Sequence, residues 1–159
     1  MVTAVSTSSE TDRIERSVVI NTPRSRVWQA LSNAEEFGNW FGVNLKGKSF
    51  APGQHVQGSF TIKGHEDCMF DIIVERVEPE KLFSYRWHPY ALDPKIDYET
   101  EQRTVVTFTL KDAGAGTLLT VVESGFDNVP PARRLEAFRM NSRGWEAQMA
   151  NIQRHAAAR

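Results

Sequence analysis

The chain has 159 residues, of which 40% are hydrophobic and 25% charged, and its formal net charge is -1. This composition is typical of a globular protein, and one domain accommodates the length. The near-neutral charge argues against a nucleic-acid partner, which would favour a basic face, and gives no reason to expect binding to an anionic membrane. The single cysteine, Cys68, rules out an internal disulfide. We therefore expect a fold that depends on its apolar core, with no metal and no cofactor.

The first twelve residues are small and polar, which predicts a loose tail ahead of one domain over residues 13–159. This start has neither the basic nor the apolar region of a signal peptide. No apolar run approaches the roughly 18 residues that a membrane-spanning helix needs. These features predict a cytoplasmic protein without membrane insertion.

In chain order, the first predicted element is a strand over residues 14–20, where apolar and polar residues alternate. Thr22 and Pro23 then favour the start of a short helix, with the threonine hydroxyl as its cap. Ser32 and Glu35 have the spacing of a capping box, which predicts a second short helix leading to Phe41.

From Gly42 to Gly125, glycine and proline separate alternating segments that predict antiparallel strands. Beyond Pro131 the apolar residues recur at steps of three and four, which predicts one long helix to about Arg154. Together these elements predict an α+β fold in which a curved sheet wraps around the final helix. The strand segments cover residues 56–62, 70–74, 83–87, 104–110 and 118–122, and the helical stripe consists of Leu135, Phe138, Ser142, Trp145, Met149 and Ile152.

Several short segments occur in a characteristic order, and they are Val18–Pro23 with Val27–Leu31, Trp40–Phe41, Pro52–Gly53, Val77–Trp87, Gly116–Thr117, Glu123–Phe126 and Gly144–Trp145. These segments resemble the START-like helix-grip (Bet v-like) superfamily, and in particular the branch of bacterial homologues of the activator of the heat-shock protein 90 ATPase. The resemblance covers about residues 13–154 and implies a curved antiparallel sheet, two short helices after the first strand, and a cavity beside the long C-terminal helix. It implies a fold with a pocket and no particular reaction.

Aromatic residues give the strongest signal for a binding site, because ligand pockets are mainly apolar with few polar anchors. Most of these rings belong to the core, and we expect a subset of them to line the cavity. Ser142 interrupts the apolar stripe beside Asn141 and would leave room for a ligand. The predicted ligand-binding residues are Trp40, Phe41, Phe60, Phe70, Trp87, Phe108, Phe138, Ser142 and Trp145.

Two residues are weak candidates for catalysis. His88 ends a strand at the expected pocket mouth, where it would transfer a proton or serve only as a strand-end residue fixed by Pro89. Glu123 is a buried carboxylate with a raised pKa if Leu119 and Val121 face inward, and a solvated one in the opposite register. The sequence leaves both alternatives open.

Two polar clusters are interpreted as ordinary surface. Residues 65–68 hold four possible metal ligands, but neighbours in a hairpin loop point in different directions, so we predict a polar turn and no metal site. The acidic run 97–101 is interpreted as a solvated loop.

Three functions are compatible with these features, and the favoured one is binding of a small apolar ligand that is lipid-like, aromatic or polyketide-like. The first alternative is a chaperone-interaction module that stimulates an ATPase of the heat-shock protein 90 type. The second is a cyclase- or hydrolase-like enzyme that uses a pocket His or Glu, although nothing in the sequence marks an enzyme. A homodimer is a further partner hypothesis.

Overall fold

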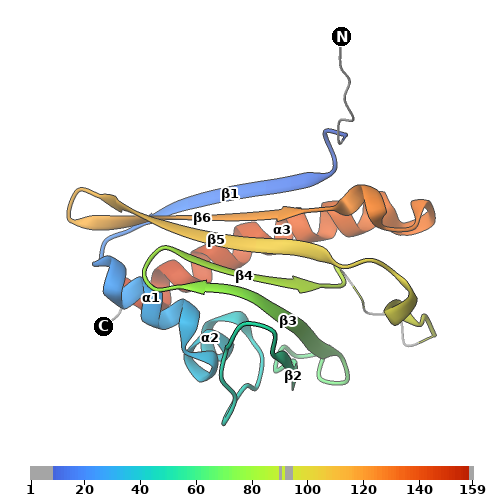
Figure 1. Cartoon of the computed structure of the whole chain (residues 1–159), viewed down its shortest axis with the longest axis horizontal. Helices are drawn as coiled ribbons and strands as arrows, with labels where there is room; N and C mark the ends of the chain where they lie inside the picture. The colour runs from blue at the N-terminus through green and yellow to red at the C-terminus, as the bar shows by residue number, and fades with distance from the viewer. Residues whose placement is uncertain (1–8, 90, 92–94, 158–159) are drawn as a thin grey trace.

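The structure is a computed structural model that describes residues 9–89, 91 and 95–157. These residues form one antiparallel sheet, three α-helices and two short 3-10 turns (Figure 1). The strands are β1 (Arg13–Ile20), β2 (His55–Ser59), β3 (Met69–Glu78), β4 (Leu82–Trp87), β5 (Thr104–Ala113) and β6 (Gly116–Ser124). The helices are α1 (Arg24–Ser32), α2 (Ala34–Phe41) and α3 (Pro131–Ala157), and the turns are η1 (Tyr98–Thr100) and η2 (Phe126–Asn128).

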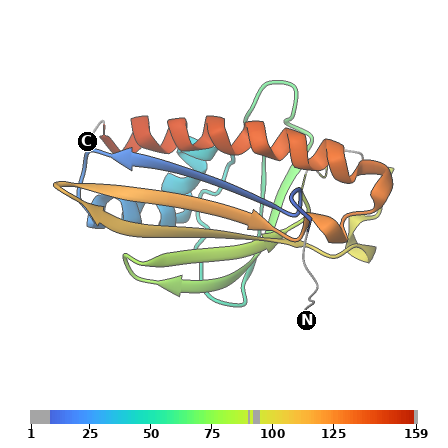
Figure 2. The same ribbon diagram turned by 90° about the horizontal axis from the view of Figure 1, so that it is seen from above.

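The six strands lie in the order β1-β6-β5-β4-β3-β2, so the first strand pairs with the last and β1 and β2 form the edges. Every neighbouring pair is antiparallel. Helix α3 runs along one face of the sheet (Figure 2). The predicted helix-grip architecture is therefore confirmed.

The core lies between this sheet face and the helices, and strand alternation determines which residues enter it. In β3, Phe70, Ile72 and Val74 are buried while the residues between them are at least partly exposed. Because successive side chains of a strand point to opposite faces, this period of two is the pattern that the sequence showed. The aromatic rings of Phe83 and Tyr85 on β4 continue the same layer.

The buried side of α3 agrees with the predicted stripe in its second half, where Trp145, Met149 and Ile152 are buried. The first turns differ, since Leu135 is 48% exposed and Ala137 is buried in its place. At this end Phe138 of the helix packs on Phe126 of η2, with ring centroids 5.5 Å apart. Its buried side is therefore set by a different neighbour.

Both predicted helix caps were wrong by one residue. Pro23 occupies the N-cap position of α1 without a side-chain hydrogen bond, while the Thr22 carbonyl accepts a hydrogen bond from the Thr117 hydroxyl. At α2 the cap is Asn33, whose Oδ1 accepts from the Glu36 amide at 2.9 Å. Asn33 has an extended backbone and is both the C-cap of α1 and the N-cap of α2, so Ser32 is still the last residue of α1 and does not cap α2.

A glycine at the end of α2 turns the chain toward the sheet. Gly42 adopts φ 96°, a left-handed conformation that favours glycine, and an added Cβ there would lie 2.9 Å from the Ile62 side chain. Directly after it, Val43 forms a bridge with Phe60. The turn thus brings the end of α2 and the segment after β2 to the same end of the core.

The predicted tail is only partly described. Residues 1–8 lie outside the described part of the chain, whereas the amide and hydroxyl of Ser9 donate to the Asp127 carboxylate at 2.8 and 2.6 Å. The Asp12 carbonyl accepts from the Gly125 amide at 3.1 Å. Ser9 and Asp12 therefore attach this part of the chain to the segment around η2, and the loose tail stays a prediction.

Candidate functional site

A cavity of about 390 Å³ lies between α3 and the end of the sheet where β3 begins and β4 ends. It is partly open to solvent, and most of its lining is apolar. The volume is at the lower end of the range for small-molecule sites, about 300–1,000 Å³. The described lining residues are Phe41, Phe60, Met69, Phe70, Asp71, Trp87, His88, Ala91, Ile96, Asp97, Tyr98, Glu99, Asn141, Gly144, Trp145 and Gln148.

Three aromatic rings from separate elements form the inner wall of the cavity. The ring centroids of Phe41 and Trp87 are 6.0 Å apart, those of Phe41 and Trp145 are 6.1 Å apart, and those of the two tryptophans are 5.8 Å apart. Phe41 and Trp145 are buried, and Trp87 is half-buried. Each ring touches both others, so we expect the wall to hold its shape without a ligand.

The carboxylate of Glu123 lies behind this wall and fixes both indoles. Its Oε2 accepts from Trp87 Nε1 at 2.7 Å and from Thr104 Oγ1 at 2.5 Å. Its Oε1 accepts from Trp145 Nε1 at 2.7 Å and from Asn141 Nδ2 at 3.0 Å. Four donors from β4, β5 and α3 therefore converge on one fully buried side chain of β6.

This arrangement resolves the question of strand register. Leu119, Val121 and Glu123 all face the core, and Glu123 lies opposite Val106 on β5 and Ile14 on β1. The carboxylate is buried, which is one of the two alternatives that the sequence left open. It does not line the cavity, however, and each oxygen already accepts two hydrogen bonds. A general base needs a lone pair that reaches the substrate, so Glu123 acts as a positioning residue for the cavity wall.

Burial raises the pKa of Glu123 above its ordinary value of 4.5, and its four hydrogen bonds oppose that rise without cancelling it. The folded state then keeps a proton that the unfolded state has already released. Its contribution to stability is therefore fully present below about 4.5 and is lost as the pH rises through the folded-state pKa. The carboxylates of Glu36 and Asp71, whose pKa values are lowered, act in the opposite direction at lower pH.

We predict that the wild type loses stability relative to Glu123→Gln as the pH rises from 4.5 to 8, so that the difference in unfolding free energy shrinks. Over this range, unfolding of the wild type releases a proton from Glu123, and the variant has no such proton. Urea denaturation at a series of pH values measures this difference. Other titrating groups cancel in the subtraction. A constant difference over the whole range would mean that folding does not raise the pKa of this carboxyl.

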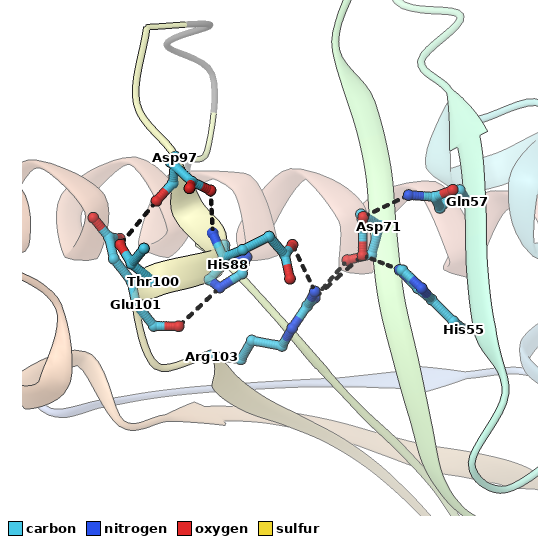
Figure 3. Close-up of polar contacts among 9 residues, drawn as sticks. His55, Gln57, Asp71, His88, Asp97, Thr100, Glu101 and Arg103 are labelled. Atoms are coloured by element: carbon cyan, nitrogen blue, oxygen red, sulfur yellow. Dashed lines mark hydrogen bonds and ion pairs between the residues drawn. The ribbon is translucent and has the colours of Figure 1, made fainter.

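Polar residues surround the outer end of the cavity, and Asp71 has the most contacts among them. Its carboxylate lies 2.6 Å from His55 Nε2, accepts from Gln57 Nε2 at 2.8 Å, and pairs with Arg103 Nη1 at 3.2 Å (Figure 3). Burial alone would raise the pKa of Asp71, but these hydrogen bonds and the Arg103 charge together lower it. The side chain is therefore a firmly held anion at the cavity mouth.

The segment around η1 supplies the other side of the mouth. The Asp97 carboxylate caps η1 by accepting from the Glu99 amide at 3.1 Å. Arg103 pairs with the Glu99 carboxylate at 3.3 Å, as well as with Asp71. The Arg133 guanidinium of α3 lies over the Tyr98 ring, 4.9 Å from its centroid. The acidic run was predicted to be a solvated loop, and Asp97, Glu99 and Thr100 are indeed exposed. In addition, Arg133 of α3 holds Tyr98 and Glu101, and Asp97, Tyr98 and Glu99 line the cavity.

His88 lines the cavity at this mouth, directly after β4. Its Nε2 lies 3.1 Å from the carbonyl oxygen of Glu101, which can only accept, so Nε2 carries the proton. The ring centroid is 6.0 Å from that of Tyr98. The contact with Glu101 holds the imidazole against the η1 segment.

Four of the nine predicted ligand-binding residues lie outside the cavity lining. Trp40 is buried among the helices, where its Nε1 donates to the Ala30 carbonyl, and Phe108 is buried one layer behind Trp145. Phe138 packs on Phe126 at the η2 end, and Ser142 is half-buried on α3. Hydrophobicity alone does not separate a ring in the core from one at the cavity. The remaining predicted residues, Phe41, Phe60, Phe70, Trp87 and Trp145, do line it.

The predicted set of ligand-binding residues omits two polar residues of α3 that line the cavity, Asn141, which was noted only beside Ser142, and Gln148. Asn141 and Gln148 lie four residues before and three residues after Trp145, so all three share one side of the helix. Gln148 Nε2 donates to the Phe41 carbonyl at 2.9 Å and ties α3 to the end of α2. Their spacing from Trp145 was available in the sequence, but a search for apolar residues passes over it.

Among the described residues, no cluster of three His, Cys, Asp or Glu side chains has the arrangement of a metal site. Residues 65–67, interpreted from the sequence as a polar turn, are exposed between β2 and β3, and Cys68 beside them is half-buried. A search of the described helices also finds none with the length and hydropathy required to cross a bilayer.

Comparison with known proteins agrees with the fold and the predicted resemblance. The profile of the family described as activator of Hsp90 ATPase homolog 1-like protein matches residues 21–157. Protein MLL2253 from Mesorhizobium loti is 26% identical, with a TM-score of 0.67 over 90% of this chain and 95% of its own. DynU16 of the dynemicin biosynthetic locus is 24% identical, with a TM-score of 0.68 over 90% of this chain and 46% of its own. The Aha1 dimer from Colwellia psychrerythraea is 15% identical, with a TM-score of 0.65 over 89% and 93%. No functionally curated protein gives a significant match.

Proposed function

Because this chain belongs to the family of activator of Hsp90 ATPase homolog 1-like proteins, whose fold here encloses a largely apolar cavity, we propose that it binds a small apolar ligand. The observation that carries the proposal is the cavity of about 390 Å³ between α3 and the sheet, lined by aromatic side chains from α2, β3, β4 and α3. Such a site suits a compact molecule of two or three rings or a short chain.

The inner wall supports this proposal because it is organised before a ligand arrives. Glu123 anchors Trp87, Trp145 and Asn141 from behind, and Gln148 anchors the end of α2. Side chains that are already held lose little conformational entropy when they contact a ligand, so less of the interaction energy is spent on ordering the site.

We expect the neutral fluorescent probe N-phenyl-1-naphthylamine to bind the purified protein with a dissociation constant of about 0.1 mM or tighter. This estimate takes roughly 0.3 kcal/mol for each heavy atom of a drug-sized ligand. A tenfold excess over the dissociation constant stabilises the folded state by about 1.4 kcal/mol and should raise the melting temperature by roughly 3–5 °C. Fluorescence titration and thermal unfolding measure the two effects independently.

Native mass spectrometry of freshly purified protein provides a second test, since a ligand carried from the cell would appear as a discrete added mass. The proposal would be abandoned if the probe neither bound nor shifted the melting temperature and a broad set of apolar compounds behaved in the same way.

The other two functions stay predictions. An enzyme would need a group that reaches its substrate, and Glu123 is saturated by hydrogen bonds behind the wall. A chaperone-interaction module gains no support from the Colwellia protein, because 15% identity speaks for the fold alone.

A further inference from the structure

We propose that the cavity selects an apolar ligand that carries a cationic nitrogen, either a protonated amine or a quaternary ammonium group, and that it rejects the matching carboxylate. This inference rests on the proposed function and adds the chemical class of the ligand. It follows from the charges at the mouth and from the hydrogen-bonding state of the inner wall.

The mouth of the cavity carries an excess of negative charge. Asp71, Asp97 and Glu99 all line it, and none of the described lining residues is lysine or arginine. Arg103 pairs with Asp71 and Glu99, and Arg133 pairs with Glu101 beside the Tyr98 ring, so two guanidinium groups lie near four carboxylates. Lys95 is exposed on the same segment and does not line the cavity. The local field therefore attracts a cation and repels an anion.

Solvent moderates this field without removing it. The Glu99 side chain is 70% exposed, whereas the Asp71 side chain is 25% exposed and fixed in place. Exposed charges are screened by salt over about 10 Å at 0.1 M ionic strength. The discrimination should therefore be largest at low salt and should decrease as salt is added.

The inner wall favours the same choice. Trp87 and Trp145 each have one indole N–H, and both donate it to Glu123, so neither remains for a ligand carboxylate. The side-chain amide groups of Asn141 and Gln148 each already donate one hydrogen bond within the protein, and a carboxylate that leaves water for too few donors is disfavoured. Phe41 and the two tryptophans also line the cavity, and the face of an aromatic ring attracts an ammonium group through the negative side of its quadrupole.

Three probes with one carbon skeleton test the proposal: 2-(1-naphthyl)ethylamine, 2-(1-naphthyl)ethanol and 1-naphthaleneacetate. At pH 7 they are cationic, neutral and anionic, and each is titrated against bound N-phenyl-1-naphthylamine. We expect the amine to displace the probe at a concentration at least tenfold lower than the acetate does, with the alcohol between them. In 0.5 M sodium chloride the ratio should fall by at least half.

Removal of charge at the mouth provides the matched variants. The double substitution Asp97→Asn and Glu99→Gln should reduce the preference for the amine over the acetate several-fold, since the asparagine keeps the side-chain oxygen that caps η1. The control is Glu146→Gln, which removes an exposed carboxylate of α3 outside the lining and should leave the ratio unchanged.

The outcomes distinguish this inference from the proposed binding of an apolar ligand, on which it rests. If the neutral probe binds and the amine and acetate displace it equally, or the acetate is tighter, selection for a cation is refuted while apolar binding stands. If the neutral probe itself does not bind, the proposed function fails, and the inference fails with it.

Discussion

Gly144→Leu is expected to weaken the binding of N-phenyl-1-naphthylamine at least tenfold while leaving the protein as stable as the wild type or slightly more so. Gly144 lies on the cavity side of α3, and a Cβ added there meets no atom within 4 Å. A leucine would extend into this empty space and occupy volume that the probe needs. Leucine also favours a helix over glycine by roughly 0.5–1 kcal/mol, so binding and stability should change in opposite directions.

The matched control for this substitution is Ala147→Leu, which adds a leucine at an exposed position of the same helix outside the cavity lining. It should bind the probe as the wild type does. Fluorescence titration gives both dissociation constants, and urea denaturation verifies that both variants fold. Undiminished binding by folded Gly144→Leu would show that the probe sits elsewhere on the protein.

Glu123→Leu should lower the free energy of unfolding by at least about 3 kcal/mol. The substitution strands the indole N–H groups of Trp87 and Trp145 and leaves the Asn141 amide and Thr104 hydroxyl without their acceptor. A buried donor without a partner costs about 1–3 kcal/mol. The variant no longer buries a carboxylate, and this offsets part of the loss in unfolding free energy. A leucine, however, offers no acceptor to any of the four donors.

Urea denaturation at pH 7 measures the effect, with Glu146→Leu as the control. Glu146 follows Trp145 on α3 and is exposed, so the same change of side chain should alter stability by no more than about 0.5 kcal/mol. A loss below 1 kcal/mol for Glu123→Leu would contradict the view that this carboxylate fastens β4, β5 and α3 together. Probe binding by the variant should also be weaker, because both tryptophans lose their anchor.

The fold could be predicted from the sequence because an element that is buried on one side has a periodic pattern of apolar residues in its local sequence. Phe70, Ile72 and Val74 alternate with more exposed residues, and Trp145, Met149 and Ile152 recur at helical spacing. Each pattern lies within a dozen residues and needs no knowledge of distant partners. The resemblance to the helix-grip superfamily then supplied the order in which these elements pack.

The polar half of the site could not be predicted in the same way. Asp71 and Arg103 are separated by 32 positions and meet only because the segment between β4 and β5 returns beside β3. A run of acidic residues has the same local sequence whether it faces water or a cavity. Its position over the mouth depends on contacts made by Arg103 and Arg133, which no local pattern encodes.

The sequence by itself determined the elements, their amphipathic faces and the abundance of aromatic residues, since these follow from side-chain types at fixed local spacing. Only the tertiary structure decided which rings face the cavity and which are packed behind it, because the two groups are equally apolar. It also decided the role of Glu123. Residues 118–122 are apolar or small on both faces of β6, so alternation favours neither register. Pairing with β1 and β5, together with four donors from three other elements, turns that carboxylate inward.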